Sequence, residues 1–218
     1  MYKLLLACFL AAASLNNATA CLNGETKSLK DGTFLYSDDF GKVPHGHTFN
    51  SAEEFEKAVV NMDSLYRLKK DISYLSDKGL LLILLKRYDE AINLYLEVEK
   101  IRPRRYSTAS NLGTAYELAG NNEQALFWIK KAVGINPHSH QRSEWIHVNI
   151  LETKIKGAAA NVSSEALIGT DFGKAAEPST TLNRNALAKL HEALYYQLNE
   201  RVSFIKTPDP IVAQLLFD

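Results

Sequence analysis

The middle of the chain repeats itself with a period of 34 residues. When residues 72–105 are aligned with residues 106–139, small residues fall on small ones and each unit ends at a proline. The matched pairs are Gly79 with Gly113, Ala91 with Ala125, Tyr95 with Ile129, Val98 with Ala132, and Pro103 with Pro137. Apolar residues recur at helical spacing in two segments of each unit, separated by a short turn. Each unit is therefore predicted to be a helix, a turn and a second helix, closed by a proline that cannot continue a helix.

This order of small and large residues resembles the tetratricopeptide repeat, which has the same period. The second unit matches at Leu112, Gly113, Tyr116, Ala125, Ala132 and Pro137. The first unit departs from the pattern, because Lys78 stands at the usual Leu position and Leu82 replaces the usual aromatic residue. The resemblance implies an all-α fold of tetratricopeptide-type helix-turn-helix repeats forming a short right-handed superhelix. It covers only about a third of the chain.

The flanking segments are expected to complete this fold. Residues 51–70 predict a capping helix that begins at a Ser51–Glu54 capping box. Residues 140–156 fit the first helix of a third repeat, although His147 stands where the repeats have glycine. Residues 21–50 predict an irregular N-terminal segment with a candidate small hairpin between Thr26 and Tyr36. Residues 157–181 predict a flexible linker or insertion. Residues 182–218 predict C-terminal helices, which are candidates for the start of further repeats.

Residues 1–20 have the pattern of a signal peptide. Lys3 precedes an apolar run, and Ala18-Thr19-Ala20 forms a small-x-small cleavage site. The apolar run is too short for a transmembrane helix, which needs about 20 residues. Cys21 follows the cleavage site directly, where a bacterial lipoprotein carries its acylated cysteine, but Ala18 stands at the usual Leu position. Two alternatives stay open: a lipid-anchored protein, such as an outer-membrane lipoprotein, and an unanchored protein of the periplasm or cell surface.

Composition and motifs argue against several classes of function. Basic and acidic residues number 25 each, so the chain has no basic field for nucleic acid. The candidate metal ligands are His45 and His47, near Asp38 and Asp39, although solvated loop histidines are the simpler interpretation. We expect no enzyme activity and no cofactor. The alternative is a periplasmic or extracellular metal-dependent enzyme that uses the His45/His47 loop.

The binding surface is predicted from the geometry of stacked helix pairs. The first helix of each pair lines the concave face. Residues of these helices that are not used in packing are predicted to line a protein-binding groove: Ser107, Ser110, Asn111, Thr114, Glu117, Gln141, Glu144 and Val148. Small polar side chains with two carboxylates suit a neutral or basic extended peptide. We expect a non-enzymatic scaffold in a bacterial cell envelope with a protein or peptide partner, which the sequence does not identify.

A short basic cluster lies where the two repeats join. Its members are Lys100, Arg102, Arg104 and Arg105. Two alternatives stay open for this cluster. It could be a solvated turn between repeats, or it could bind an acidic partner or lipid head groups.

Overall fold

A computed structural model describes residues 27–38, 41–157, 162–175, 177–205 and 208–218. The predicted signal peptide and Cys21 lie outside the described residues. In the part of the chain that is described, no helix is long and apolar enough to cross a membrane.

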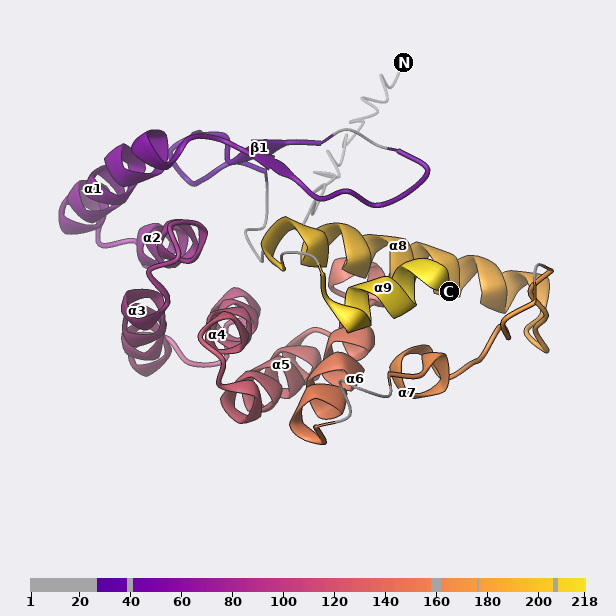
Figure 1. The fold of residues 1–218 in the computed structure, drawn as a ribbon. Coiled ribbons are helices and arrows are strands. Elements are labelled where there is room, and N and C mark those ends of the chain that lie inside the picture. Colours follow the sequence, from indigo (N-terminus) through magenta and orange to yellow (C-terminus); the bar gives the residue numbers. More distant parts are fainter. Residues whose placement is uncertain (1–26, 39–40, 158–161, 176, 206–207) are drawn as a thin grey trace, which may run out of the picture.

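The described part of the chain is mostly helical, and the first helices stand side by side in an arc (Figure 1). The arc runs through α1 (Ala52–Lys69), α2 (Ser73–Leu84), α3 (Tyr88–Ile101), α4 (Tyr106–Leu118), α5 (Asn122–Ile135) and α6 (Glu144–Ile155). A short 3-10 turn, η1 (His140–Arg142), precedes α6. The chain then forms α7 (Ser164–Ile168), α8 (Arg184–Phe204) and α9 (Pro210–Phe217). Helix α8 lies across the open side of the arc (Figure 1).

Both predicted repeats are helix pairs, and small residues bring the two helices of each pair together. A Cβ atom on Gly79 would lie 2.5 Å from Cζ of Tyr95, and one on Gly113 would lie 2.5 Å from Cδ1 of Ile129. Tyr95 is fully buried and its hydroxyl donates to the Ser76 carbonyl over 2.7 Å. The pairing of glycine with a large residue across each helix pair therefore confirms the packing that the sequence pattern predicts.

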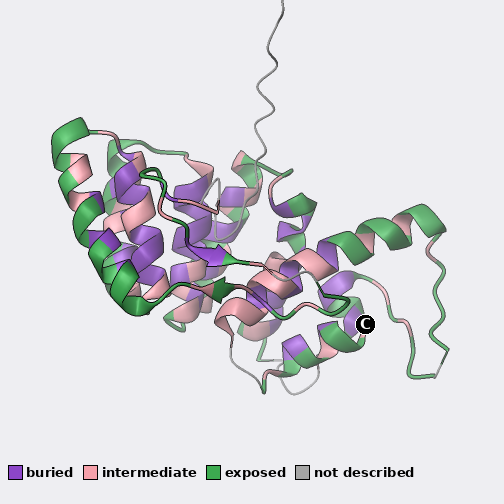
Figure 2. Cartoon of the chain, turned by 90° about the horizontal axis from the view of Figure 1, so that it is seen from above, coloured by how far each residue is buried: buried purple, intermediate pink, exposed green. Residues whose placement is uncertain are grey.

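Helix α1 covers the first repeat, as expected for a cap. The Ser51 hydroxyl accepts from the Glu54 amide, and the Glu54 carboxylate accepts from the Ser51 amide over 2.9 Å, which completes the capping box. Phe55 and Met62 of α1 are buried in one apolar cluster with Leu80 of α2. This cluster extends through α5, whereas α6, α7, α8 and α9 share a second core (Figure 2).

The N-terminal segment contains the small hairpin that the sequence predicted, together with a second short pairing. Ser28 bridges to Phe34, and the Gly32 amide donates to the Leu29 carbonyl over 2.9 Å at the turn between them. Strands β1 (Tyr36–Ser37) and β2 (Thr48–Phe49) then pair antiparallel, with Tyr36 opposite Phe49. Figure 1 shows this segment extending from α1 toward α8.

The C-terminal part differs from the expectation of a linker followed by further repeats. Residues 164–168 form helix α7, and its Leu167 and Ile168 are buried against α6, α8 and α9. Helices α8 and α9 do not extend the stack of repeats, because α8 packs against η1, α6 and α9. The physical reason begins in α6, where His147 replaces the glycine that allows a second helix to approach closely in the first two pairs.

Candidate functional site

The predicted groove residues lie on α4, η1 and α6, but α8 covers much of the surface that they form. Thr114 is half-buried and Gln141 is exposed, whereas Val148 packs against the α5 side of α6. The other predicted groove residues are buried: Ser107, Ser110, Asn111, Glu117 and Glu144. Asn111 donates to the Tyr95 hydroxyl over 2.7 Å and so belongs to the interior of the first repeat pair. The binding role of this face stays a prediction.

Glu117 is the point where three helices meet. Its Oε2 lies 2.6 Å from Nε2 of His147, and its Oε1 lies 2.6 Å from Nζ of Lys154, both on α6. The same Oε1 accepts from Nη2 of Arg201, on α8, over 2.8 Å. The side chains of Glu117 and Arg201 are only 5% and 6% exposed, so α8 reaches the predicted groove through a buried ion pair. A basic peptide was one of the partners predicted for this carboxylate. In the structure, the cation that pairs with it comes from the protein itself.

The charges in this cluster shift one another's pKa values. Burial alone would raise the pKa of Glu117, but Arg201, His147 and Lys154 outweigh it and hold that pKa well below its ordinary value. Burial would lower the pKa of His147, whereas Glu117 and Glu144 raise it to about 9. Glu117 is therefore ionised and His147 carries a proton at neutral pH.

A second buried pair lies beside the first. His140 Nδ1 pairs with Glu144 Oε1, and Glu144 also accepts from the Tyr106 hydroxyl over 3.2 Å. Glu144 raises the pKa of His140 against the opposing effect of burial. Gln197 of α8 donates to the Ser143 hydroxyl over 3.0 Å, next to this pair. Together these contacts fix α8 to the loop between α5 and α6.

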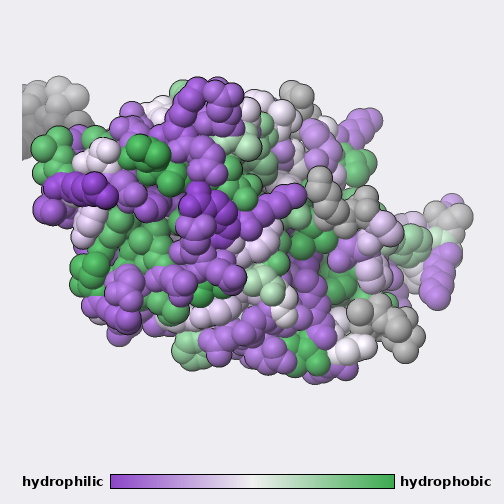
Figure 3. All heavy atoms as spheres, turned by 60° about the vertical axis from the view of Figure 1, so that its left-hand side comes forward, coloured by the Kyte–Doolittle hydropathy of each residue, from purple (hydrophilic) through white to green (hydrophobic). Residues whose placement is uncertain are grey.

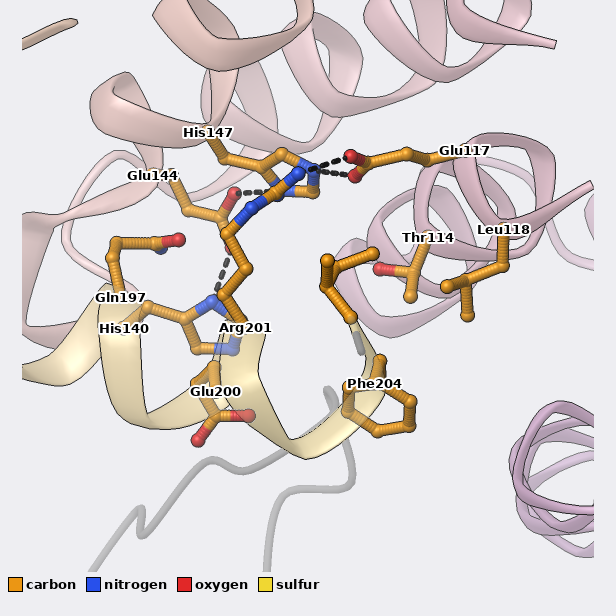
Figure 4. Close-up of a pocket in the computed structure, with 11 residues that line it drawn as sticks. Thr114, Glu117, Leu118, His140, Glu144, His147, Gln197, Glu200, Arg201 and Phe204 are labelled. Carbon is orange, nitrogen blue, oxygen red and sulfur yellow. Dashed lines mark hydrogen bonds and ion pairs between the residues drawn. The ribbon is translucent and has the colours of Figure 1, made fainter. Parts of the chain in front are cut away.

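A pocket remains between α4 and α8, with about 510 Å³ of empty space, part of it open solvent. Figure 4 shows Thr114, Leu118 and Phe204 on one side of the opening, and His140, Glu144 and Arg201 on the other. One wall is thus largely apolar and the other is charged.

The N-terminal segment fastens to the opposite side of α8. The amide of Gly46 donates to Oδ1 of Asn199 over 3.1 Å, and the amide of His47 donates to Oγ of Ser203 over 2.9 Å. His47 lies between two carboxylates, with Nδ1 2.5 Å from Asp38 and Nε2 3.1 Å from Glu200. We call residues 41–49 the strap, because they join the N-terminal segment to α8.

The two candidate metal ligands of this loop face different partners. His45 is exposed and its Nδ1 lies 3.3 Å from the carbonyl of Val43, whereas both nitrogens of His47 contact carboxylates. The structure therefore does not bring His45 and His47 together around one point. Within the described ranges, no group of three or more His, Cys, Asp or Glu side chains has the geometry of a metal site. Asp39, the other predicted neighbour, lies outside those ranges.

Reasoning from sequence missed several residues of the site, and more than half of them come from α8 and its C-terminal end. They are Leu118, His140, His147, Lys154, Gln197, Glu200, Arg201, Phe204 and Ile205. The sequence signal that could have indicated these residues was Glu117 itself. A carboxylate that is buried by a covering helix requires a cation as its partner. The sequence offered many candidate cations and no rule for choosing among them.

Comparison with known proteins identifies the repeats. The tetratricopeptide repeat family matches residues 72–105 and 106–139, which confirms the resemblance with the same boundaries. No curated protein matches the chain. The solved structure "MamA RS-1 ArsTM double mutant" is 16% identical, with a TM-score of 0.43, and the similarity covers 66% of this chain and 66% of that chain, just under two thirds. We draw neither fold nor function from a likeness this weak.

Proposed function

We propose that this tetratricopeptide repeat protein is a non-enzymatic scaffold that binds a protein partner at the pocket between α4 and α8. Two consecutive repeats of this family support a role in protein–protein interaction, since stacked helix pairs present a concave face to partners. The observation that carries the proposal is that the pocket stays open on this face, whereas most of the other predicted groove residues are buried.

The chemistry of the pocket favours a neutral peptide with an apolar side chain. Glu117 is already balanced by Lys154, His147 and Arg201, and Glu144 is balanced by His140. The sequence predicted a neutral or basic peptide, and a basic one would find no free carboxylate at these two positions in this conformation. The apolar wall of Leu118, Phe204 and Ile205 would take an aliphatic or aromatic side chain, and the Thr114 hydroxyl could bond to the peptide backbone.

We also propose that the protein acts in a bacterial cell envelope. This part of the proposal is supported by the signal-peptide pattern of residues 1–20, namely Lys3, the apolar run and the Ala18-Thr19-Ala20 site. Lipid attachment at Cys21 is the finer alternative. The intact mass of the protein recovered from the envelope shows whether Cys21 is acylated. An acylated Cys21 adds the mass of its lipid to the chain that begins there.

The test compares two Leu→Glu variants in a crosslinking pull-down from the native envelope. Leu118→Glu places a charge in the pocket, and Leu187→Glu makes the same change on the exposed start of α8. We expect Leu187→Glu to retain the proteins that are captured by the unmodified chain, whereas Leu118→Glu should lose at least one of them.

Thermal unfolding shows whether Leu118→Glu remains folded. If it does not, Thr114→Gln narrows the same pocket with a neutral side chain and replaces it in the comparison. Equal capture by the pocket variant and by Leu187→Glu would refute the pocket as the binding site.

A further inference from the structure

One edge of the helix stack collects basic side chains from successive loops. Because consecutive helices run in opposite directions, the loops after α1, α3 and α5 lie at the same edge of the layer. The buried cluster of Ile72, Leu75 and Val98 joins the end of α1, the start of α2 and the end of α3. Tyr106 at the start of α4 contacts His140 and Glu144, which places the loops after α3 and α5 side by side. We call this side the loop edge.

The loop edge carries exposed cations with no acidic partner among the described residues. They are Arg67, Lys69, Lys70, Arg102, Arg104 and Arg142. Acids on the same edge are already paired. Glu97 contacts Lys100 over 2.6 Å, Glu99 contacts Lys131 over 2.7 Å, and Asp71 lies 3.6 Å from Nζ of Lys30. The edge is therefore positive although the whole chain has no net charge.

Three of these basic residues have positive φ angles, a backbone conformation in which glycine would be less strained. Lys70 has φ 55°, Arg104 has φ 63° and Arg142 has φ 62°, all in the left-handed region. A residue with a Cβ atom is strained in this region relative to glycine. Lys86, on the opposite edge, has the same conformation with φ 60°, but the neighbouring Arg87 is paired with Glu56 and Glu90.

Two large apolar side chains stand among these cations. Leu68 in the last turn of α1 is 78% exposed, and Ile101 at the end of α3 is 59% exposed. Figure 3, which brings the side of α1 and α3 forward, shows hydrophobic residues in patches separated by hydrophilic ones. An acidic protein or nucleic acid would require only the charges. Cations with apolar side chains between them suit a surface that has anionic head groups over an apolar layer.

We propose that the loop edge binds the surface of an anionic phospholipid membrane. The cations face the head groups, and Leu68 and Ile101 enter the boundary between head groups and acyl chains. Lys70, Arg102 and Arg104 do not line the α4–α8 pocket, so partner binding and membrane binding can fail independently.

The test measures binding of the full chain to vesicles of phosphatidylcholine containing phosphatidylglycerol, with phosphatidylcholine vesicles as the baseline. The edge variant combines Lys70→Asn, Arg102→Asn and Arg104→Asn, since asparagine tolerates the left-handed conformation. Each removed charge should weaken binding about fivefold, so the triple variant should bind roughly 100-fold more weakly. High salt should weaken binding by the unmodified chain.

The control variant removes the same number of charges elsewhere. Lys86, Lys156 and Lys174 are exposed and lie away from the loop edge, and Lys86→Asn also reproduces the left-handed position. This control should bind anionic vesicles as the unmodified chain does. Leu68→Ser with Ile101→Ser should weaken the binding that remains at high salt.

Three results would overturn the proposal. One is equal binding of the edge and control variants to anionic vesicles. Another is equal binding of the unmodified chain to anionic and neutral vesicles. The third is retention on a soluble polyanion such as heparin without any binding to vesicles, which would assign the edge to an acidic macromolecule instead.

Discussion

At the scale of single residues, Glu117 determines how the C-terminal half attaches to the repeats. It stands on the second repeat, and its three cationic partners come from α6 and α8. Because the carboxylate and Arg201 are both buried, neither can exchange its partner for water without a large cost. A residue that the sequence assigned to peptide binding therefore has a structural role in this conformation.

Replacing Glu117 by glutamine should destabilise the fold. The amide keeps the shape of the side chain but removes the one carboxylate that pairs with Arg201 among the described residues, so we expect a loss of about 3–5 kcal/mol in the free energy of unfolding. Urea unfolding measures this loss. Glu192→Gln is the matched control on the exposed face of α8, where we expect a change within about 0.5 kcal/mol. Similar losses in both variants would contradict the role of Glu117.

His147 makes a prediction about pH. Its pKa is raised from the ordinary 6.5 to about 9, so its protonation stabilises the fold fully below pH 6.5. That contribution is lost as the pH rises through about 9, which should lower the free energy of unfolding by up to about 3 kcal/mol. Urea unfolding across this pH range measures the loss. In the His147→Gln variant, most of this decrease in the free energy of unfolding should be absent.

The remaining fall in His147→Gln should come from His47 and His140, whose pKa values are also raised. His191→Gln, on the exposed face of α8, should keep the full pH dependence. Identical pH curves for His147→Gln and the unmodified protein would show that the buried histidine does not stabilise the fold by its charge.

At the scale of elements, each repeat depends on one glycine that allows two helices to touch. Gly113→Ala would place a methyl group 2.5 Å from Cδ1 of Ile129, so we expect a loss of about 1–3 kcal/mol in the free energy of unfolding. Gly134→Ala is the control, since nothing lies within 4 Å of its added Cβ, and it should stabilise α5 by about 0.4–1 kcal/mol.

A double variant separates this contact from helix propensity. Ile129→Ala removes both Cδ1 and Cγ1, the two atoms that would lie 2.5 Å from the added Cβ, so Gly113→Ala should cost less in that background than in the unmodified chain. Strictly additive losses in thermal or urea unfolding would contradict the close approach of α4 and α5 at this point.

The elements differ in how much their sequence reveals. The repeats and the α1 cap could be predicted because a small residue facing a large one, and a capping box, are local patterns with one structural solution. The period of residues 182–205 also predicted helix α8. Its position could not be predicted, because Leu194 and Leu198 form an apolar face that would pack equally well on a further repeat. Contacts with residues distant in the sequence fix where α8 lies: Arg201 pairs with Glu117, Gln197 donates to Ser143, and Asn199 and Ser203 accept from the strap.

The candidate site was predictable to a smaller extent for the same reason. Of the predicted groove residues, Thr114, Glu117 and Glu144 line the pocket, whereas Asn111 contacts Tyr95 in the interior. Whether these residues are open or covered depends on α8 and the strap, which come from the two ends of the described chain. His45 and His47 looked equivalent in sequence, but a single strap places one in solvent and the other between two carboxylates.

At the scale of the whole molecule, the strap and the repeats hold α8 from two sides (Figure 1). Gly46 lies where the strap contacts α8 and has φ 86°. An added Cβ would lie 3.0 Å from both the amide nitrogen and the hydroxyl of Ser203. Gly46→Ala should therefore detach the strap, and hydrogen exchange should show faster exchange at the amides of residues 46 and 47.

Gly32→Ala provides the control for that experiment. Gly32 has a similar φ of 92°, but nothing lies within 4 Å of its added Cβ. It carries the same backbone cost without the contact to α8, so the strap amides should keep their protection. Equal loss of protection in both variants would mean that backbone strain alone, and not the contact with Ser203, holds the strap.

The proposed function is tested most directly by a photoreactive amino acid placed at position 118, in the α4–α8 pocket, and in a second protein at position 187. After irradiation in the native envelope, position 118 should yield a defined crosslinked protein that position 187 does not. The identity of that protein would name the partner. Absence of a crosslink at position 118, or the same products from both positions, would contradict partner binding at this pocket.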